Sequence, residues 1–350
     1  MVDANNILLP YNFSVAAGQA VPYALDLAAQ TGAALHTLSV DVLRGNFPLS
    51  SSTREAILDD VRGRFDEALV TNAGGRYGRD DVQFVHASRR NIEATSAILR
   101  YATAQDIDVI VMGTHGRSGL RRFAVGSVAE TIVRKAPCPV LTVRRAGESA
   151  PSERWALQRI LVPTDFSKRS REALSRAKAI AAHFGAEIDL FHAVEETLPP
   201  AFYGPTIQSI YDAQPNIEDK VTARLKKLYR TTEGRGGEVT FSTKSGDASK
   251  AIAEHADASG ADLIVMATHG RTGLARVAAL GSVAETVVRT APCPVLTARR
   301  FHASPVGASA DAAPSAGDGH SKAVPGRPRP SGTVSEPSST SRESLPRSPR

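Results

Sequence analysis

The sequence has few aromatic residues, almost no cysteine and no long apolar run. Aromatic residues make up 5% of the 350 residues, so a core must depend on Val, Ile, Leu and Ala. Two cysteines cannot form a disulfide framework, which favours a reducing compartment. No segment approaches the roughly 18 apolar residues of a membrane-spanning helix, and the first residues lack the basic and apolar stretches of a signal peptide. We therefore expect a cytoplasmic protein with no membrane partner.

The excess of positive charge is small and spread along the chain. The net charge is +6, from 42 basic and 36 acidic residues. Residues 301–350 contain six basic and four acidic residues, which leaves 36 against 32, or +4, for residues 1–300. Basic residues cluster there only as short pairs such as Arg89 with Arg90. This pattern is typical of a mildly basic, solvated surface, and we expect no nucleic-acid partner.

The chain contains one unit written twice. Residues 127–145 (SVAETIVRKAPCPVLTVRR) and 282–300 (SVAETVVRTAPCPVLTARR) are identical at 16 of 19 positions. A polar stretch with small residues and a proline, residues 147–153 (GESAPSE), lies between the two units. We expect one domain over residues 1–147 (repeat 1) and a second over 154–300 (repeat 2).

Each repeat alternates expected strands with helices. Short β-branched or aliphatic runs bounded by proline or glycine are typical of buried parallel strands. Four of the expected strands lie near residues 7–9, 35–40, 109–111 and 140–143 of repeat 1, and near 160–162, 188–194, 263–265 and 295–298 of repeat 2. The remaining strand of each repeat, the third, is expected with its helix around residues 82–102 and 239–256. This alternation predicts an α/β fold with a doubly wound, parallel five-stranded sheet in each repeat and helices on both faces.

The first helix of each repeat has different signals. In repeat 2, Ser167 is the expected N-cap and Gly185 the C-terminal stop. In repeat 1, Gly18 and Pro22 fall inside the equivalent segment, and we expect them to shorten or kink that helix.

Residues 301–350 have a different composition. They include eight Pro, eleven Ser and five Gly, with Phe301 as the one aromatic residue. Such a segment cannot bury enough apolar surface to offset its ordering entropy, so we expect a disordered tail. Its end, SLPRSPR (344–350), leaves a partner or phosphorylation site as an alternative to a plain solvated tail.

One glycine-rich loop carries the candidate chemistry. In repeat 1 the fourth strand leads into Gly113 and Gly116, and nine residues later Gly126 and Ser127 open a helix. Ligands of open α/β sheets bind beyond the carboxyl ends of the strands. Glycines allow close backbone approach, and a helix N-terminus favours an anion. The spacing therefore fits a phosphate site, although tight strand-to-helix turns alone would also explain the glycines.

These blocks together resemble the universal stress protein family. The resemblance is carried by VPTDFS (162–167), VMGTHGRSGL (111–120), GSVAET (126–131) and APCPVL (136–141), and most of these blocks recur in the other repeat. It implies two Rossmann-like (adenine nucleotide alpha hydrolase-like) domains and, in one branch of the family, ATP with or without Mg²⁺. The implied nucleotide-binding residues are Asn12, Val40, Gly113, His115, Gly116, Gly126, Ser127 and Val128 in repeat 1, and Asp165, Ala193, Gly270, Gly281 and Ser282 in repeat 2. Among these, Val40 would lie beside the adenine.

Both repeats depart from the family pattern. Asp165 keeps the first-strand aspartate, whereas repeat 1 has Asn12, which retains an acceptor but no charge. Repeat 2 has Ala267 in place of the first loop glycine and ten residues rather than nine before Gly281. We estimate a cost of about 1 kcal/mol for Asn12 and about 3 kcal/mol for the altered loop. We therefore expect repeat 1 to bind ATP roughly thirtyfold more tightly.

Enzymatic motifs are missing from the sequence. It has no lysine after the loop glycines, as a P-loop needs, and no G-x-S-x-G elbow. His115 and His269 have no second His or Cys at metal-ligand spacing, and Cys138 and Cys293 fit small core positions better than a redox pair. We expect nucleotide binding without efficient catalysis. Two alternatives stay open: a nucleotide-free protein acting through protein contacts, and a slow ATPase or autophosphorylating protein.

The last strands of the two repeats offer a pairing surface. The family resemblance implies association through this strand, and the short linker raises the effective concentration of the partner strand within one chain. We expect an intrachain pseudo-dimer through residues 140–143 and 295–298, and a homodimer of two chains stays open. The sequence names no protein partner.

Overall fold

The computed structural model describes nine stretches of the chain. These are residues 4–42, 59, 62–63, 65–66, 81–114, 126–144, 155–195, 216–268 and 281–298. The expected tail, 301–350, lies outside the described residues.

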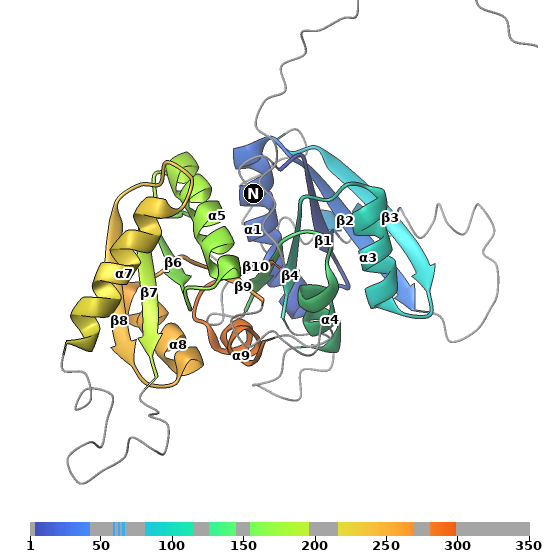
Figure 1. Ribbon diagram of the computed structural model, residues 1–350. Helices are drawn as coiled ribbons and strands as arrows, with labels where there is room; N and C mark the ends of the chain where they lie inside the picture. Colours follow the sequence, from blue (N-terminus) through green and yellow to red (C-terminus); the bar gives the residue numbers. More distant parts are fainter. Residues whose placement is uncertain are drawn as a thin grey trace, which may run out of the picture. The chain divides into compact units, whose positions relative to one another are not determined.

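Each repeat contains a five-stranded parallel sheet (Figure 1). In repeat 1 the strands are β1 (Asn6–Pro10), β2 (Ala34–Val42), β3 (Phe84–Asn91), β4 (Val109–Gly113) and β5 (Val140–Val143), in the order β3-β2-β1-β4-β5. In repeat 2 they are β6 (Arg159–Pro163), β7 (Glu187–Val194), β8 (Val239–Ser245), β9 (Leu263–Ala267) and β10 (Val295–Ala298), in the order β8-β7-β6-β9-β10. All pairs within a repeat are parallel, which confirms the predicted fold class.

Helices cover both faces of the sheet and bury a core on each. The helices are α1 (Val15–Thr31), α3 (Ala94–Ala104), α4 (Ser127–Lys135), α5 (Lys168–Phe184), α7 (Ile217–Thr231), α8 (Ala248–Ser259) and α9 (Ser282–Thr290). Side chains of α1, α5 and α7 belong to one buried cluster, and those of α3, α4, α8 and α9 belong to the other. This division places the helix that follows β1 and the helix that follows β4 on opposite faces of the sheet.

The first helices of the two repeats have the same length, which corrects one expectation. Both α1 and α5 span 17 residues, so Gly18 and Pro22 do not shorten α1. Side-chain caps fix the starts at Ser14 and Ser167, and left-handed glycines fix the ends. The apolar face of α1 is buried, so packing and caps outweigh the local cost of Pro22.

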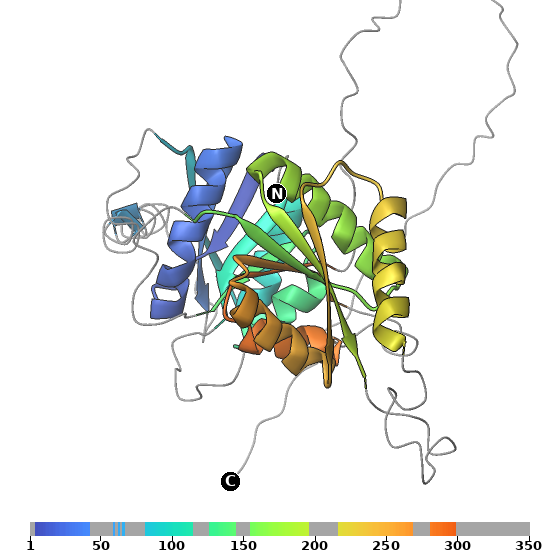
Figure 2. The same cartoon turned by 90° about the vertical axis from the view of Figure 1, so that its left-hand side faces the viewer.

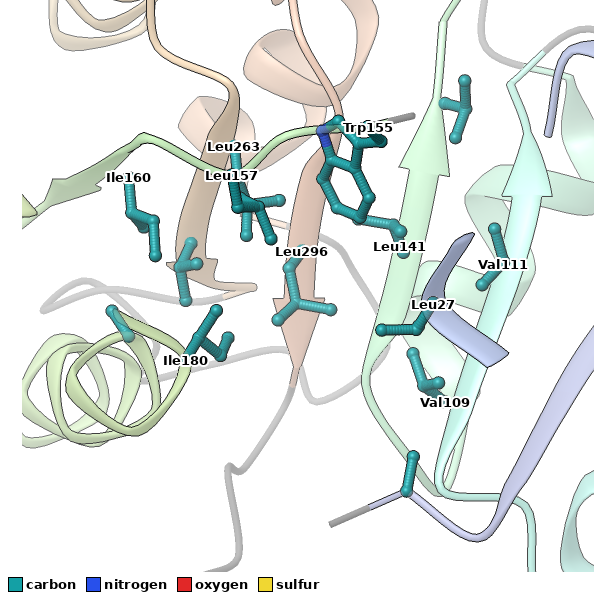
Figure 3. Packing of buried hydrophobic residues seen from close by; sticks show 14 of the residues in the cluster. Leu27, Val109, Val111, Leu141, Trp155, Leu157, Ile160, Ile180, Leu263 and Leu296 are labelled. Atoms are coloured by element: carbon teal, nitrogen blue, oxygen red, sulfur yellow. The ribbon is translucent and has the colours of Figure 1, made fainter. Parts of the chain in front are cut away.

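The two sheets join at their last strands. β5 and β10 pair antiparallel, with Leu141 opposite Leu296, and the order of the joined sheet therefore runs through ten strands. The Thr142 hydroxyl donates to the Val295 carbonyl across this pair (3.1 Å). Figure 3 shows that Leu141 and Leu296 lie close to Trp155, the first described residue of repeat 2. The two repeats therefore share backbone pairing and part of one buried cluster.

Trp155 ties repeat 2 to α1 of repeat 1. Its backbone N–H donates to the buried Asp26 carboxylate (2.7 Å), and its indole N–H donates to the Asp262 carbonyl (3.3 Å). Its ring meets that of Tyr23 edge-on, with centroids 5.2 Å apart. These contacts are additional to the β5–β10 pairing.

Candidate functional site

The candidate site of each repeat lies where its strand order reverses. In repeat 1, β1 lies between β2 and β4, and α1 and α4 leave the carboxyl ends of β1 and β4 towards opposite faces. β6, β7 and β9 repeat this arrangement in repeat 2. A crevice at such a reversal is where open α/β sheets bind ligands.

A tight turn follows the first strand of each repeat. The Asn12 side-chain oxygen accepts the Ser14 N–H (3.1 Å), and the Asp165 carboxylate accepts the Ser167 N–H (3.0 Å). The exchange of Asp for Asn therefore keeps this turn, because both side chains supply the same acceptor.

The residue inside this turn has a rare backbone conformation. Phe13 has φ 58° and Phe166 has φ 63°, the left-handed region that bulky residues seldom adopt. Strain of this kind costs on the order of 1–3 kcal/mol and clusters at ligand sites. The sequence analysis did not identify these two phenylalanines as site residues. The one signal for them in the sequence is that Asn or Asp, Phe and Ser recur in this order in both repeats.

Apolar side chains border the site on the side of α4 and α9. Val40, near the end of β2, and Val128, in the first turn of α4, both pack half-buried against the same core cluster. Ala193 and Val283 are their counterparts in repeat 2 and pack against that cluster in the same way. Val283 was not among the predicted site residues, although the repeat offset from Val128 would have identified it.

A buried threonine closes the base of each glycine-rich loop. In repeat 1 the Gly126 N–H donates to the Thr114 carbonyl (2.6 Å), and the Thr114 N–H donates to Val143 (3.1 Å). In repeat 2 the Gly281 N–H donates to the Thr268 carbonyl (2.9 Å). The N–H groups of Gly126 and Gly281 therefore donate to these carbonyls, which leaves the following amides of α4 and α9 for a ligand.

The helices after these loops begin without a side-chain cap. Gly126 and Gly281 are the N-caps of α4 and α9 and have no side chain that could bond the first amides. Side chains of Ser14, Ser167 and Asp247 cap α1, α5 and α8, whereas α3 and α7 also lack a side-chain cap bond. The first amides of α4 and α9, with the hydroxyls of Ser127 and Ser282, are therefore suited to an anion.

Gly113 is required by packing within repeat 1. A Cβ at this position would lie 2.2 Å from the Ala16 carbonyl oxygen of α1. At the equivalent place repeat 2 carries the methyl group of Ala267. The contact with α1 explains this glycine without a ligand.

Three predicted residues, His115, Gly116 and Gly270, lie outside the described residues. The structure brings the remaining ones to the carboxyl edges, with Asn12, Val40, Gly113, Gly126, Ser127 and Val128 in repeat 1 and Asp165, Ala193, Gly281 and Ser282 in repeat 2. Each group comes from three or four separate elements.

The two cysteines are poor nucleophiles. Burial raises the pKa of Cys138 and of Cys293 to about 12, so both thiols stay protonated near neutral pH. Among the described residues, no group of three His, Cys, Asp or Glu side chains could hold a metal ion. No helix in the described part of the chain is long and apolar enough to cross a membrane.

The fold and the site define a tandem, doubly wound α/β protein with a candidate ligand site at the carboxyl edge of the sheet in each half. The family model described as "Universal stress protein family" matches residues 4–144 and 156–299. The chain therefore belongs to the universal stress protein family, with one family domain in each repeat.

Similar proteins support this assignment. A universal stress protein of Methanocaldococcus jannaschii is 35% identical over 144 residues, which covers 41% of this chain and 82% of that protein. One from Mycobacterium tuberculosis is 28% identical over 200 residues, which covers 56% of this chain but only 63%, less than two thirds, of the relative. The crystal structure of a universal stress protein from Archaeoglobus fulgidus has a TM-score of 0.57 and 21% identity, and covers 85% of this chain and 99% of that one. At that identity the structural likeness shows the fold alone.

Proposed function

We propose that this universal stress protein binds an adenine nucleotide, ATP, at the carboxyl edges of its sheets, as a stress-response or signalling module without efficient catalysis. The observation that carries the proposal is the uncapped start of α4 and α9, next to the turn made by Asn12 or Asp165. Amides and a hydroxyl at a helix N-terminus suit phosphate, and a polar turn with a half-buried apolar side chain suits a nucleoside.

The described side chains supply little for catalysis. They include no cluster for a metal, so a Mg²⁺ ion would have to enter with the nucleotide phosphates, which are its usual ligands. The Ser127 and Ser282 hydroxyls are the candidates to touch the ion or a phosphate oxygen. Because the pKa of Cys138 and of Cys293 is high, neither side chain forms a thiolate near neutral pH.

The proposal is tested by a variant that changes only the loop base. Gly126 has φ −60° and ψ 140°, which alanine adopts without strain, so Gly126→Ala keeps the fold and adds a methyl group beside the Ser127 amide. Loss of one charge-assisted bond predicts about thirtyfold weaker ATP binding by calorimetry. Gly63→Ala is the control, because a Cβ there meets no atom within 4 Å. Absence of ATP binding to the parent protein would refute the proposal, and rapid phosphate release from bound ATP would refute the lack of catalysis.

We also propose that the two pockets are unequal, with repeat 1 the tighter. Packing against Ala16 explains Gly113, so the presence of Ala267 at the equivalent place is weak evidence against a phosphate site in repeat 2. The extra loop residue before Gly281 still favours repeat 1. Calorimetry should show two binding phases about thirtyfold apart, with Gly126→Ala removing the tighter and Gly281→Ala the weaker. The reverse assignment would show that the ranking is wrong.

A further inference from the structure

Helices α5 and α7 lie on the same face of the repeat 2 sheet (Figure 2) and contribute side chains to the same buried cluster. The Arg171 guanidinium of α5 donates to the Thr231 hydroxyl of α7 (2.9 Å), which joins the two helices. The exposed cations of the two helices, named here the α5–α7 basic face, are Lys168, Arg169, Arg171, Lys220, Arg224, Lys226, Lys227 and Arg230. Against these eight, the exposed acidic residues of the same helices are Glu218 and Asp219.

The cations of this face are not neutralised by ion pairs within the described chain. None of the eight takes part in one of the ion pairs formed by the described residues, whereas Lys244 and Lys250 of the same repeat both pair with Glu254. The Arg224 guanidinium lies over the Phe166 ring, 4.0 Å from its centroid, which leaves its N–H groups at the surface.

Like charges also face one another along α7. Lys220 precedes Arg224 by four residues, and Lys226 precedes Arg230 by four, so each pair lies on one side of the helix. Such pairs destabilise a helix by about 0.2–0.5 kcal/mol each. These like-charge pairs lower the stability of α7, so a contribution to stability does not explain the basic face.

Repeat 1 shows that the fold does not need these charges. Its helix α1, the counterpart of α5, contains no Lys or Arg. In the sequence, residues 54–70 of repeat 1 contain three basic and five acidic residues. The counterpart of α5 therefore forms without basic side chains, which points to a role for the basic face in repeat 2 alone.

The described residues of this face include no exposed large apolar side chain, which favours a nucleic acid as the partner over a protein or a membrane. Among the described residues the exposed large hydrophobic side chains are Val15, Val42 and Ile92, all in repeat 1. Protein interfaces depend on buried aromatic or aliphatic anchors, and membrane binding on inserted apolar groups, whereas phosphate contacts alone give non-specific nucleic-acid binding. We infer that the α5–α7 basic face binds the phosphate backbone of a nucleic acid, without reading its bases.

Helical spacing fits such a ligand. Lys220, Arg224 and Lys227 follow one side of α7, about 6 and 4.5 Å apart along the axis. At these separations the flexible Lys and Arg side chains can each reach a different phosphate of a single strand. A nucleic-acid partner was not expected from the sequence, because net charge does not show that cations of two segments about 50 residues apart meet on one face.

The test uses the full chain and a labelled 20-nucleotide single-stranded RNA of mixed sequence, followed by fluorescence anisotropy at several salt concentrations. The variant combines Lys220→Gln, Arg224→Gln and Lys227→Gln, all exposed side chains. The control combines Arg62→Gln, Arg100→Gln and Lys135→Gln, which remove the same charge from exposed positions of repeat 1. Three lost phosphate contacts predict about hundredfold weaker binding at 0.1 M salt and a salt slope smaller by about two, with the control close to the parent.

Several outcomes would overturn the inference. One is equal affinity of the variant and the control, and another is an affinity of the parent too weak to measure at low salt. A third is displacement of the RNA by polyglutamate of equal charge concentration as effectively as by unlabelled RNA, which would indicate an acidic protein partner. Binding to anionic lipid vesicles but not to RNA would indicate a membrane. ATP binding of the same variant, measured by calorimetry, separates the two proposals, because Arg224 contacts Phe166 in the turn beside Asp165.

Discussion

At Gly113 a methyl group would collide with the backbone of α1, although Ala267 carries one at the same place in repeat 2. We predict that Gly113→Ala lowers the free energy of unfolding by about 1–3 kcal/mol, because a helix backbone must move to admit the methyl group. Ala267→Gly should cost only about 0.5–1 kcal/mol, since it adds backbone entropy to the unfolded state. Urea unfolding of both variants checks this. Equal effects would show that α1 yields easily at this contact.

His36 is a buried histidine whose titration should be visible in stability. Its ring nitrogens contact the Tyr101 hydroxyl (3.0 Å) and the Asn6 side chain (3.3 Å), and burial lowers its pKa below the ordinary value of 6.5. The unfolded chain therefore binds the proton more tightly, so stability is present above pH 6.5 and is lost as the pH falls below it.

The measurement compares unfolding free energies at pH 7 and pH 5. We predict that the parent loses stability over this range and that His36→Gln, although less stable at pH 7, loses less of it. His183→Gln, an exposed substitution on α5, is the control and should follow the parent. An unchanged pH dependence in His36→Gln would assign the acid sensitivity to other groups.

At the scale of elements, the buried Lys178 of α5 caps the C-terminal end of α7. The Lys178 ammonium of α5 donates to the Tyr229 and Thr232 carbonyls (2.8 Å each) and lies over the Tyr229 ring. Burial lowers the pKa of Lys178, a desolvation cost that the carbonyls at the negative end of the helix offset. We predict that Lys178→Met costs about 3 kcal/mol in urea unfolding, because two carbonyls lose their donor. Lys226→Met, exposed on α7, should change stability by less than about 0.5 kcal/mol. A similar small effect at Lys178 would show that water replaces the ammonium.

Sequence patterns predicted elements better than they predicted contacts. Caps and apolar runs indicated the strands and the limits of α5, because those signals are local. The full length of α1 despite Pro22 depended on packing against the sheet, which no local signal contains. The bond from Gly126 to Thr114 and the approach of Ala16 to Gly113 join residues that only the fold brings together. The carboxyl-edge position of the site was predictable from topology, but which amides remain for a ligand was not.

At the scale of the whole molecule, the described part of the chain has one sheet through both repeats and two buried clusters, each of which includes residues of both repeats. Separation of the repeats would expose Leu141 and Leu296 and break the β5–β10 pairing. We therefore predict that the two repeats unfold in a single transition. Trp155 is the only tryptophan in the sequence and reports on this junction, where it is 9% exposed. Its fluorescence and the far-ultraviolet circular dichroism should change at the same urea concentration.

A variant at the junction decides whether the repeats are coupled through Trp155. Asp26 is buried and accepts the Trp155 N–H, and Asp26→Ala would leave that donor without its acceptor, at a cost of about 1–3 kcal/mol. If the junction couples the repeats, this loss should lower the midpoint of both signals together, and Asp257→Ala, exposed on α8, should leave both nearly unchanged. If the fluorescence midpoint falls and the circular dichroism midpoint does not, the repeats fold separately and Trp155 only covers their boundary. The joined sheet favours the first result, because strand pairing and side-chain contacts at the junction are lost in the same step.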